Sequence, residues 1–275
     1  MPIYLPGQAW EPGSFASILA IGDSWFWYPN NNILGALVAH PSLKDPYRNI
    51  QMLGFNGAKL HDYVFGKYKA EFTYELEPIN SQYYSAVLIS GAGNDAVEYR
   101  LALKDQCRGL TSAADCFDPA GTDDLLQEIS RALSAVIHDV SWEISKQNRT
   151  VDIFLHGYDY SVPDGRGFQL VPDIITIAGP WLKSAMDAVG VLNDMNLRKD
   201  ICRILIDRLN GVFLGLNGTS GPGYRVNYID SRGVLDSGNG YQADWANELH
   251  PTPSGFNKIV DQRWIPAFRN QNLAT

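Results

Sequence analysis

The sequence lacks long apolar runs and an excess of basic residues. No stretch of its 275 residues approaches the roughly 20 uninterrupted apolar residues of a membrane-spanning helix. The formal net charge is -8, which disfavours the broad surface of clustered Lys and Arg that binds nucleic acids. Residues 1–10 show no basic segment followed by an apolar one, as an export signal would. We therefore predict no membrane span, no nucleic-acid partner and a soluble, cytoplasmic protein, with export by another route left open.

Cysteine is also scarce. The three cysteines, Cys107, Cys116 and Cys202, cannot all pair within one chain, and no Cys-x-x-Cys or His-rich spacing indicates a zinc site. Cys107 and Cys116 lie close together in a loop-like segment, where they are either free thiols or a disulfide. A disulfide there would indicate an oxidising compartment.

Apolar residues, in contrast, are plentiful, at 45% of the chain. Short apolar runs alternate with longer amphipathic stretches, a pattern typical of strands joined by crossover helices. The predicted strands are residues 17–22, 49–53, 84–90, 151–156 and 225–230, and the predicted helices are residues 32–39, 123–147 and a region at about 180–209. This order predicts an α/β fold, a three-layer α/β/α sandwich around a doubly wound, parallel, five-stranded sheet. Active sites in such folds lie beyond the carboxyl ends of the strands.

Two segments, residues 100–122 and 157–172, interrupt the alternation close to strand ends. Insertions at such places commonly form lids or pocket walls, and solvated surface loops fit the sequence equally well. The sequence has no internal repeat and no interdomain linker. We therefore predict one domain over residues 1–275 with these two loop insertions.

Four short motifs follow predicted strands, namely GDS at 22–24, GFNGA at 54–58, GAGND at 91–95 and NELHPT at 247–252. Each has an ordinary structural explanation as a helix cap, a tight turn or a buried histidine. Glycine turns and an Asn amide also supply the hydrogen-bond donors that stabilise an oxyanion, and a rigidly held His can act as a base. A nucleotide-binding GxGxxG motif is excluded because the third glycine is missing.

The four motifs, in this order, resemble the SGNH/GDSL hydrolase family, whose first block looks like IGDSW at residues 21–25. The resemblance extends from the first strand to the final helix, and it implies a flavodoxin-like sheet of the SGNH-hydrolase type. It implies Ser24 as nucleophile and His250 as general base. It also implies an oxyanion hole made by the backbone amide of Ser24 together with Gly57 and Asn94.

One position departs from the family pattern, which usually has Asp three residues before the histidine. Here that residue is Asn247, which can accept the imidazole N–H but carries no charge. In serine proteases the equivalent change lowers turnover by about ten-thousandfold, mainly through the wrong His tautomer. The candidates for orienting His250 are therefore Asn247, a backbone carbonyl, Asp244 and Glu248.

Aromatic residues gather directly after Ser24, at Trp25, Phe26, Trp27 and Tyr28. Polar and aromatic residues lie at the end of the fourth strand and just after it, at His156, Tyr158, Asp159 and Tyr160. Some of these are expected in the core or in hydrogen-bonded loops, and the others along the substrate cleft. The predicted substrate-binding residues are Trp25, Phe26, Tyr158 and Asp95.

The resemblance implies hydrolysis of a carboxylic ester through an acyl-enzyme, as in esterases, lipases and acetylesterases, without a metal or organic cofactor. The substrate class stays broad: a small-molecule, glycan or lipid ester. The alternatives are a catalytically inactive or weakly active binding protein with the same fold, and an acyltransferase. A flavodoxin-like nucleotide-binding protein ranks last because the sequence lacks a phosphate-binding loop.

Overall fold

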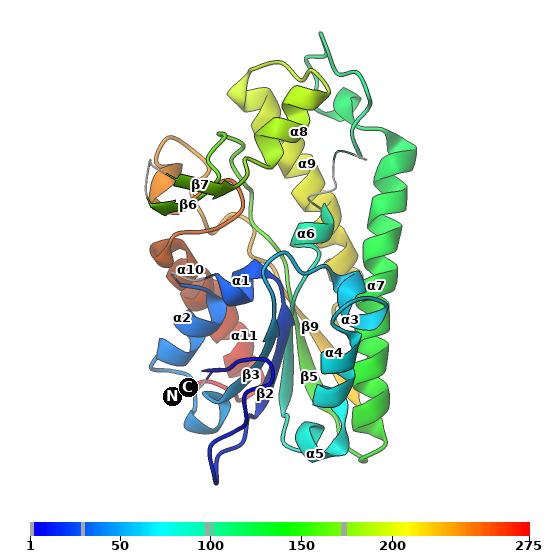
Figure 1. Cartoon of the computed structure of the whole chain (residues 1–275), viewed down its shortest axis with the longest axis vertical. Coiled ribbons are helices and arrows are strands. Elements are labelled where there is room, and N and C mark those ends of the chain that lie inside the picture. The colour runs from blue at the N-terminus through cyan, green and yellow to red at the C-terminus, as the bar shows by residue number, and fades with distance from the viewer. Residues whose placement is uncertain (1–2, 29–30, 97–99, 101, 172–174) are drawn as a thin grey trace.

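The computed structural model of the protein describes residues 3–28, 31–96, 100, 102–171 and 175–275 (Figure 1). The strands are β1 Ile3–Tyr4, β2 Ile18–Gly22, β3 Ile50–Gly54, β4 Ala86–Ser90, β5 Val151–His156, β6 Phe168–Val171, β7 Ile175–Ala178, β8 Ser220–Gly221 and β9 Tyr224–Ile229. The α-helices are α1 Ser24–Trp27, α2 Ile33–Ala39, α3 Leu60–Val64, α4 Lys69–Leu76, α5 Pro78–Ser81, α6 Gly93–Ala96, α7 Pro119–Ser145, α8 Leu182–Ala188, α9 Met195–Leu214, α10 Pro253–Ile259 and α11 Ile265–Asn270. Shorter turns are the 3-10 helices η1 Asp45–Tyr47, η3 Ala114–Cys116 and η4 Tyr241–Ala243 and the π-helical η5 Val260–Trp264.

In the part of the chain that the structure describes, seven strands form one sheet in the order β1-β3-β2-β4-β5-β9-β8. The pairs from β1 to β9 in this sheet are parallel, and the edge pair of β8 and β9 is antiparallel. All five predicted strands are present, which confirms an α/β fold with a largely parallel sheet. The sheet has seven strands rather than five, because β1 and β8 extend its edges. Each has two residues, too few to show the alternation that reveals a strand in a sequence.

Helices lie on both sides of this sheet. Figure 1 shows α2, α10 and α11 on one side and α3, α4 and α7 on the other. Every residue of β2, β3 and β4 is buried, as expected for parallel strands covered on both faces. The central strands therefore end inside the protein, and the residues just beyond their carboxyl ends can be enclosed by loops.

The long helix α7 was predicted over residues 123–147 and is found over Pro119–Ser145. Its earlier start has a local cause, since Asp118 accepts the backbone N–H of Gly121 at 2.9 Å and Pro119 occupies the first helical position. The predicted helical region at 180–209 consists of two helices, α8 and α9. The second begins after Asp194, whose carboxylate accepts the backbone N–H of Asn196 at 2.8 Å.

The first predicted insertion, residues 100–122, contains η3 and the first turn of α7, and an isolated bridge joins Leu103 to Phe117. Cys107 and Cys116 are buried free thiols here, as is Cys202, so the disulfide alternative does not hold in the structure. The second insertion, residues 157–172, leads into the hairpin of β6 and β7, and its last residue lies outside the described part of the chain. Over the described residues, no helix has the length and apolarity needed to cross a bilayer.

Candidate active site

The first motif forms the junction between β2 and α1. Gly22 ends the strand, and a Cβ at this position would lie 2.6 Å from the backbone oxygen of Ser90, so no side chain fits. Asp23 caps α1, because its carboxylate accepts the backbone N–H of Trp25 at 3.0 Å. Ser24 is therefore the first residue of a helix, just beyond the carboxyl end of an interior strand of the sheet.

Ser24 and His250, which are 226 residues apart in the chain, are in hydrogen-bond contact. The distance from Ser24 Oγ to His250 Nε2 is 2.6 Å. On the other side of the imidazole ring, His250 Nδ1 lies 3.0 Å from Asn247 Oδ1. The structure thus links the predicted nucleophile, the predicted base and Asn247 by two consecutive hydrogen bonds.

The orientation of the Asn247 amide is fixed by its other contacts. Its Oδ1 also accepts the backbone N–H groups of Leu249 at 3.0 Å and of His250 at 2.9 Å, which a nitrogen at this position could not do. Its Nδ2 faces the hydroxyl of Tyr28 at 3.4 Å. Because Oδ1 accepts, His250 Nδ1 carries the proton, and Nε2 is left with a lone pair toward Ser24.

His250 lies in an aromatic, largely buried environment. Its ring stacks on Tyr28 with a centroid distance of 4.4 Å, and Trp181 meets it edge-on at 6.0 Å. Burial lowers the pKa of His250 to about 3. The imidazole is therefore neutral, and able to accept a proton, at any pH well above that value.

The two carboxylates considered for orienting His250 have other partners. Asp244 accepts hydrogen bonds from Lys258 at 2.7 Å and from the backbone N–H of Asp236 at 2.9 Å. Glu248 is fully buried and accepts four backbone N–H groups from residues 165–183. Of the three side chains considered, Asn247 is the one in contact with the imidazole.

Gly57 and Asn94 line the same cavity as Ser24 and His250. Gly57 has a φ of +74°, in the left-handed region that favours glycine, and no atom lies within 4 Å of the position of a Cβ. Asn94 Nδ2 donates to the backbone oxygen of Ala58 at 3.0 Å, which anchors its amide to the second motif. All four motifs therefore contribute residues to one cavity.

A buried network that the sequence does not reveal links the first motif to the third. The hydroxyl of Tyr158 donates to Asp23 Oδ2 at 2.5 Å and accepts the backbone N–H of Gly93 at 3.1 Å. Burial raises the pKa of Asp23 to about 7, although the hydrogen bonds from Tyr158 and Trp25 lower it. Tyr158 thus ties the loop of Ser24 to the loop of Asn94.

The raised pKa of Asp23 predicts a pH-dependent stability. The folded protein binds the Asp23 proton more tightly than the unfolded chain, so this contribution is full below about pH 4 and is lost as the pH rises through about 7. The free energy of unfolding should therefore fall by up to about 4 kcal/mol over that range relative to Asp23→Asn. Urea unfolding at several pH values measures the difference. The exposed Asp45→Asn variant is the control, and a difference for Asp23→Asn that stays constant with pH would contradict the prediction.

Of the predicted substrate-binding residues, Trp25 and Tyr158 line a cavity beside Ser24. Phe26 is fully buried and packs on Trp264 at 6.0 Å, because consecutive side chains of a helix point in different directions. Asp95 accepts the backbone N–H of Leu60 at 3.1 Å and borders a separate cavity. The structure therefore brings two of these four residues to Ser24.

His156, the last residue of β5, and Asp159, in the loop after it, are both buried and hydrogen-bonded. His156 is buried, with Nε2 at 2.9 Å from Ser231 Oγ and Nδ1 at 3.3 Å from Ser90 Oγ. Asp159 is fully buried and accepts four backbone N–H groups, including that of Leu235 at 2.7 Å. These contacts correspond to the alternative of a hydrogen-bonded loop.

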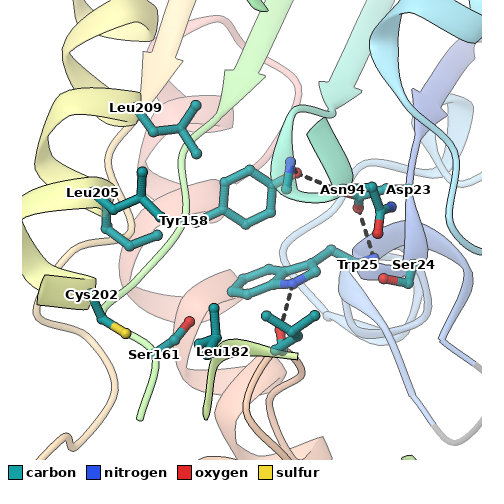
Figure 2. Close-up of a pocket in the computed structure, with 13 residues that line it drawn as sticks. Asp23, Ser24, Trp25, Asn94, Tyr158, Ser161, Leu182, Cys202, Leu205 and Leu209 are labelled. Atoms are coloured by element: carbon teal, nitrogen blue, oxygen red, sulfur yellow. Dashed lines mark hydrogen bonds between the residues drawn. The ribbon is translucent and has the colours of Figure 1, made fainter. Parts of the chain in front are cut away.

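Two cavities meet at Ser24, and both are also lined by Asn94 and Leu249. The first, called the apolar slot, has a volume of about 50 Å³, and its walls include Trp25, Leu182, Cys202, Leu205, Ile206 and Leu209 (Figure 2). The second, called the wide cavity, has a volume of about 270 Å³, and its walls include Trp27, Tyr28, Asn56, Phe168, Trp181 and His250. Of the aromatic residues that follow Ser24, Trp27 and Tyr28 thus line the wide cavity.

Among the described residues, no group of three or more His, Cys, Asp or Glu side chains is placed to hold a metal ion. That the protein needs neither a metal nor an organic cofactor stays a prediction.

No family model and no curated protein matches this chain. Solved structures that are similar to this chain include a Streptococcus pneumonia protein described as a proposed platelet activating factor, which is 14% identical with a TM-score of 0.49 over 94% of this chain and 85% of that one. A lipase from a goat rumen metagenome is 13% identical with a TM-score of 0.46, over 90% of this chain and 95% of the lipase. A family 3 carbohydrate esterase from Talaromyces cellulolyticus is 11% identical with a TM-score of 0.44, over 94% of this chain and 98% of the esterase.

Proposed function

We propose that the protein is a serine hydrolase of the SGNH type that cleaves a carboxylic ester through an acyl-enzyme on Ser24. The observation that carries the proposal is the 2.6 Å contact between Ser24 Oγ and His250 Nε2, with Asn247 Oδ1 on the far nitrogen of the ring. A weakly nucleophilic hydroxyl needs a neighbouring base, and that base needs a partner that fixes its tautomer. These three residues supply both requirements.

The reaction has two steps. His250 Nε2 takes the Ser24 proton while Oγ attacks the ester carbonyl carbon, and the same nitrogen then gives the proton to the departing alcohol oxygen. Water attacks the acyl-enzyme with His250 again as base, and the carboxylic acid leaves as Ser24 regains its proton. Each proton begins and ends on a named atom, and no redox partner is required.

Three donors are available to the oxyanion. The backbone N–H of Ser24 lies at the start of α1, where helix amides have no intrahelical acceptor. Gly57 presents an open backbone face, and Asn94 Nδ2 carries a second proton besides the one given to Ala58. Their convergence on the cavity at Ser24 supports an oxyanion hole.

The wider architecture supports the same proposal. The five long strands of the sheet have the spatial order β3-β2-β4-β5-β9, in which the second strand precedes the first. This is the flavodoxin-like order, and ligands bind where the direction of winding reverses, next to the first strand. Ser24 follows that strand. We infer that residues 1–275 form one domain whose substrate is a small-molecule, glycan or lipid ester.

Labelling with a fluorophosphonate, which reacts with activated serines, tests the proposal. We expect one adduct on Ser24, located by peptide mass spectrometry, and much slower labelling of His250→Ala because the hydroxyl has lost its base. Ser134→Ala, at an exposed serine on α7, is the control and should be labelled like the parent. An adduct on another serine, or equal labelling of His250→Ala, would remove the basis for the mechanism.

A further inference from the structure

The position of His250 determines which cavity receives which part of an ester. In the tetrahedral intermediate the carbonyl carbon carries Ser24 Oγ, the oxyanion, the acyl chain and the alcohol oxygen. The alcohol oxygen has to lie near His250 Nε2 because it takes its proton from that atom. His250 lines the wide cavity and, among the described residues, is not part of the lining of the apolar slot. The alcohol therefore points into the wide cavity, and the slot is left for the acyl chain.

The far wall of the slot is one face of α9. Cys202, Leu205, Ile206 and Leu209 follow one another at the spacing that places side chains on the same side of a helix. Figure 2 shows Cys202, Leu205 and Leu209 across the slot from Ser24 and Asn94, with the rings of Trp25 and Tyr158 in between. The slot thus leads from the nucleophile over two aromatic rings to an aliphatic surface.

The polar atoms of the two aromatic walls already have partners. Trp25 Nε1 donates to the backbone oxygen of Leu249 at 3.0 Å, and the hydroxyl of Tyr158 is held by Asp23 and by the backbone N–H of Gly93. These two residues therefore offer carbon surface to a ligand. Ser161 adds one hydroxyl to a lining that is otherwise largely apolar. Such a slot favours a hydrocarbon chain over a polar group.

We propose that the apolar slot binds the acyl chain of the substrate, and that the substrate is an ester of an unbranched fatty acid longer than acetate. This inference rests on the proposed function, because it uses His250 as the proton donor to the alcohol. The slot, at about 50 Å³, has a much smaller volume than the wide cavity, at about 270 Å³, so an unbranched acyl chain should enter it more readily than a branched one. The wide cavity, bordered by Trp27, Tyr28 and Trp181, takes the alcohol.

The test compares kcat/KM for p-nitrophenyl esters that share one alcohol and differ in acyl length from acetate to octanoate. Each methylene that enters the slot should raise kcat/KM by roughly fourfold until the slot is full. Pivalate should react at least about tenfold more slowly than pentanoate, which has the same number of carbons, because a branched group does not fit.

Two substitutions on α9 change the slot in opposite directions. Cys202→Phe fills it and should lower the ratio of hexanoate to acetate kcat/KM by at least about tenfold, whereas Leu205→Ala opens it and should raise the ratio of octanoate to acetate by about tenfold. Leu214→Ala, at an exposed position of the same helix, is the control and should leave both ratios unchanged. If Cys202→Phe does not fold, the opposite shift in Leu205→Ala still tests the slot.

The outcomes separate the two proposals. Hydrolysis that requires Ser24 but shows the same chain-length profile in the parent and both variants would overturn the slot and leave the hydrolase intact. A change in preference among acetate esters of different alcohols, without a change in acyl preference, would assign the slot to the alcohol and overturn the inference. Hydrolysis of no ester, or hydrolysis that persists in Ser24→Ala, would remove the proposed function and the slot with it.

Discussion

Replacing Ser24 by Ala is expected to lower kcat for a p-nitrophenyl ester by at least about ten-thousandfold, with little change in KM. The substitution removes the only atom that bonds to the acyl carbon, and serine hydrolases lose activity on this scale when the nucleophile is lost. The oxyanion donors and both cavities remain, so substrate binding should be retained. Steady-state kinetics of purified parent and variant give the two constants.

The structure also predicts that Ser24→Ala folds normally. Asp23, not Ser24, caps α1, and alanine is favourable at an early helical position. The free energy of unfolding should therefore stay within about 0.5 kcal/mol of the parent. A variant that is equally stable and retains more than about a tenth of the parent kcat would show that Ser24 is not the nucleophile.

The sequence predicts the parts of this site that depend on local structure. Gly22 and Gly57 mark backbone positions that side chains would obstruct or strain, and each follows an apolar run that could be recognised as a strand. The contact between Asn247 and His250 spans three residues, so the turn itself creates it. Parallel strands then bring these turns to one edge of the sheet, which is why motifs far apart in the chain meet.

Other features depend on contacts between distant segments, which one sequence does not show. The hydrogen bond between Tyr158 and Asp23 joins residues 135 positions apart, and nothing in the residues around Tyr158 indicates it. Trp25 and Phe26 are neighbours of similar character, yet Trp25 lines the slot and Phe26 enters the core, because the register of a four-residue helix decides between them. The spacing of the apolar residues at 202–209 on α9 is the same for a helix face in the core and for one that borders a cavity, and the structure shows that this face lines the slot.

Replacing Asn247 by Asp is expected to raise kcat/KM by about ten- to a hundredfold at neutral pH. The oxygen that accepts from His250 Nδ1 is already held by two backbone N–H groups, so the tautomer is correct in the parent. What the parent lacks is negative charge to stabilise the imidazolium that forms as Ser24 attacks. The Tyr28 hydroxyl, 3.4 Å from Asn247 Nδ2, can rotate to donate to the new carboxylate.

The same substitution should move the acid limb of the pH–rate profile. Burial holds the pKa of His250 at about 3 in the parent, so the base stays neutral in mildly acidic solution. A carboxylate at hydrogen-bond distance raises the pKa of an imidazole by about 1–3 units. Because protonated His250 cannot accept the Ser24 proton, Asn247→Asp should lose activity at a higher pH than the parent as the solution is acidified. A kcat/KM profile against pH measures both the gain and the shift.

Asn94→Asp is the matched control, since it adds the same charge on the other side of Ser24. There the carboxylate replaces an oxyanion donor and repels the developing charge, so kcat should fall by at least about a hundredfold. Opposite effects of these two Asn→Asp substitutions would show that the position of the negative charge controls the rate. A charge beside His250 Nδ1 would stabilise the imidazolium, whereas a charge at position 94 would destabilise the oxyanion. Equal effects, or an acid limb that does not move in Asn247→Asp, would contradict the role of Asn247 as the residue that orients the base.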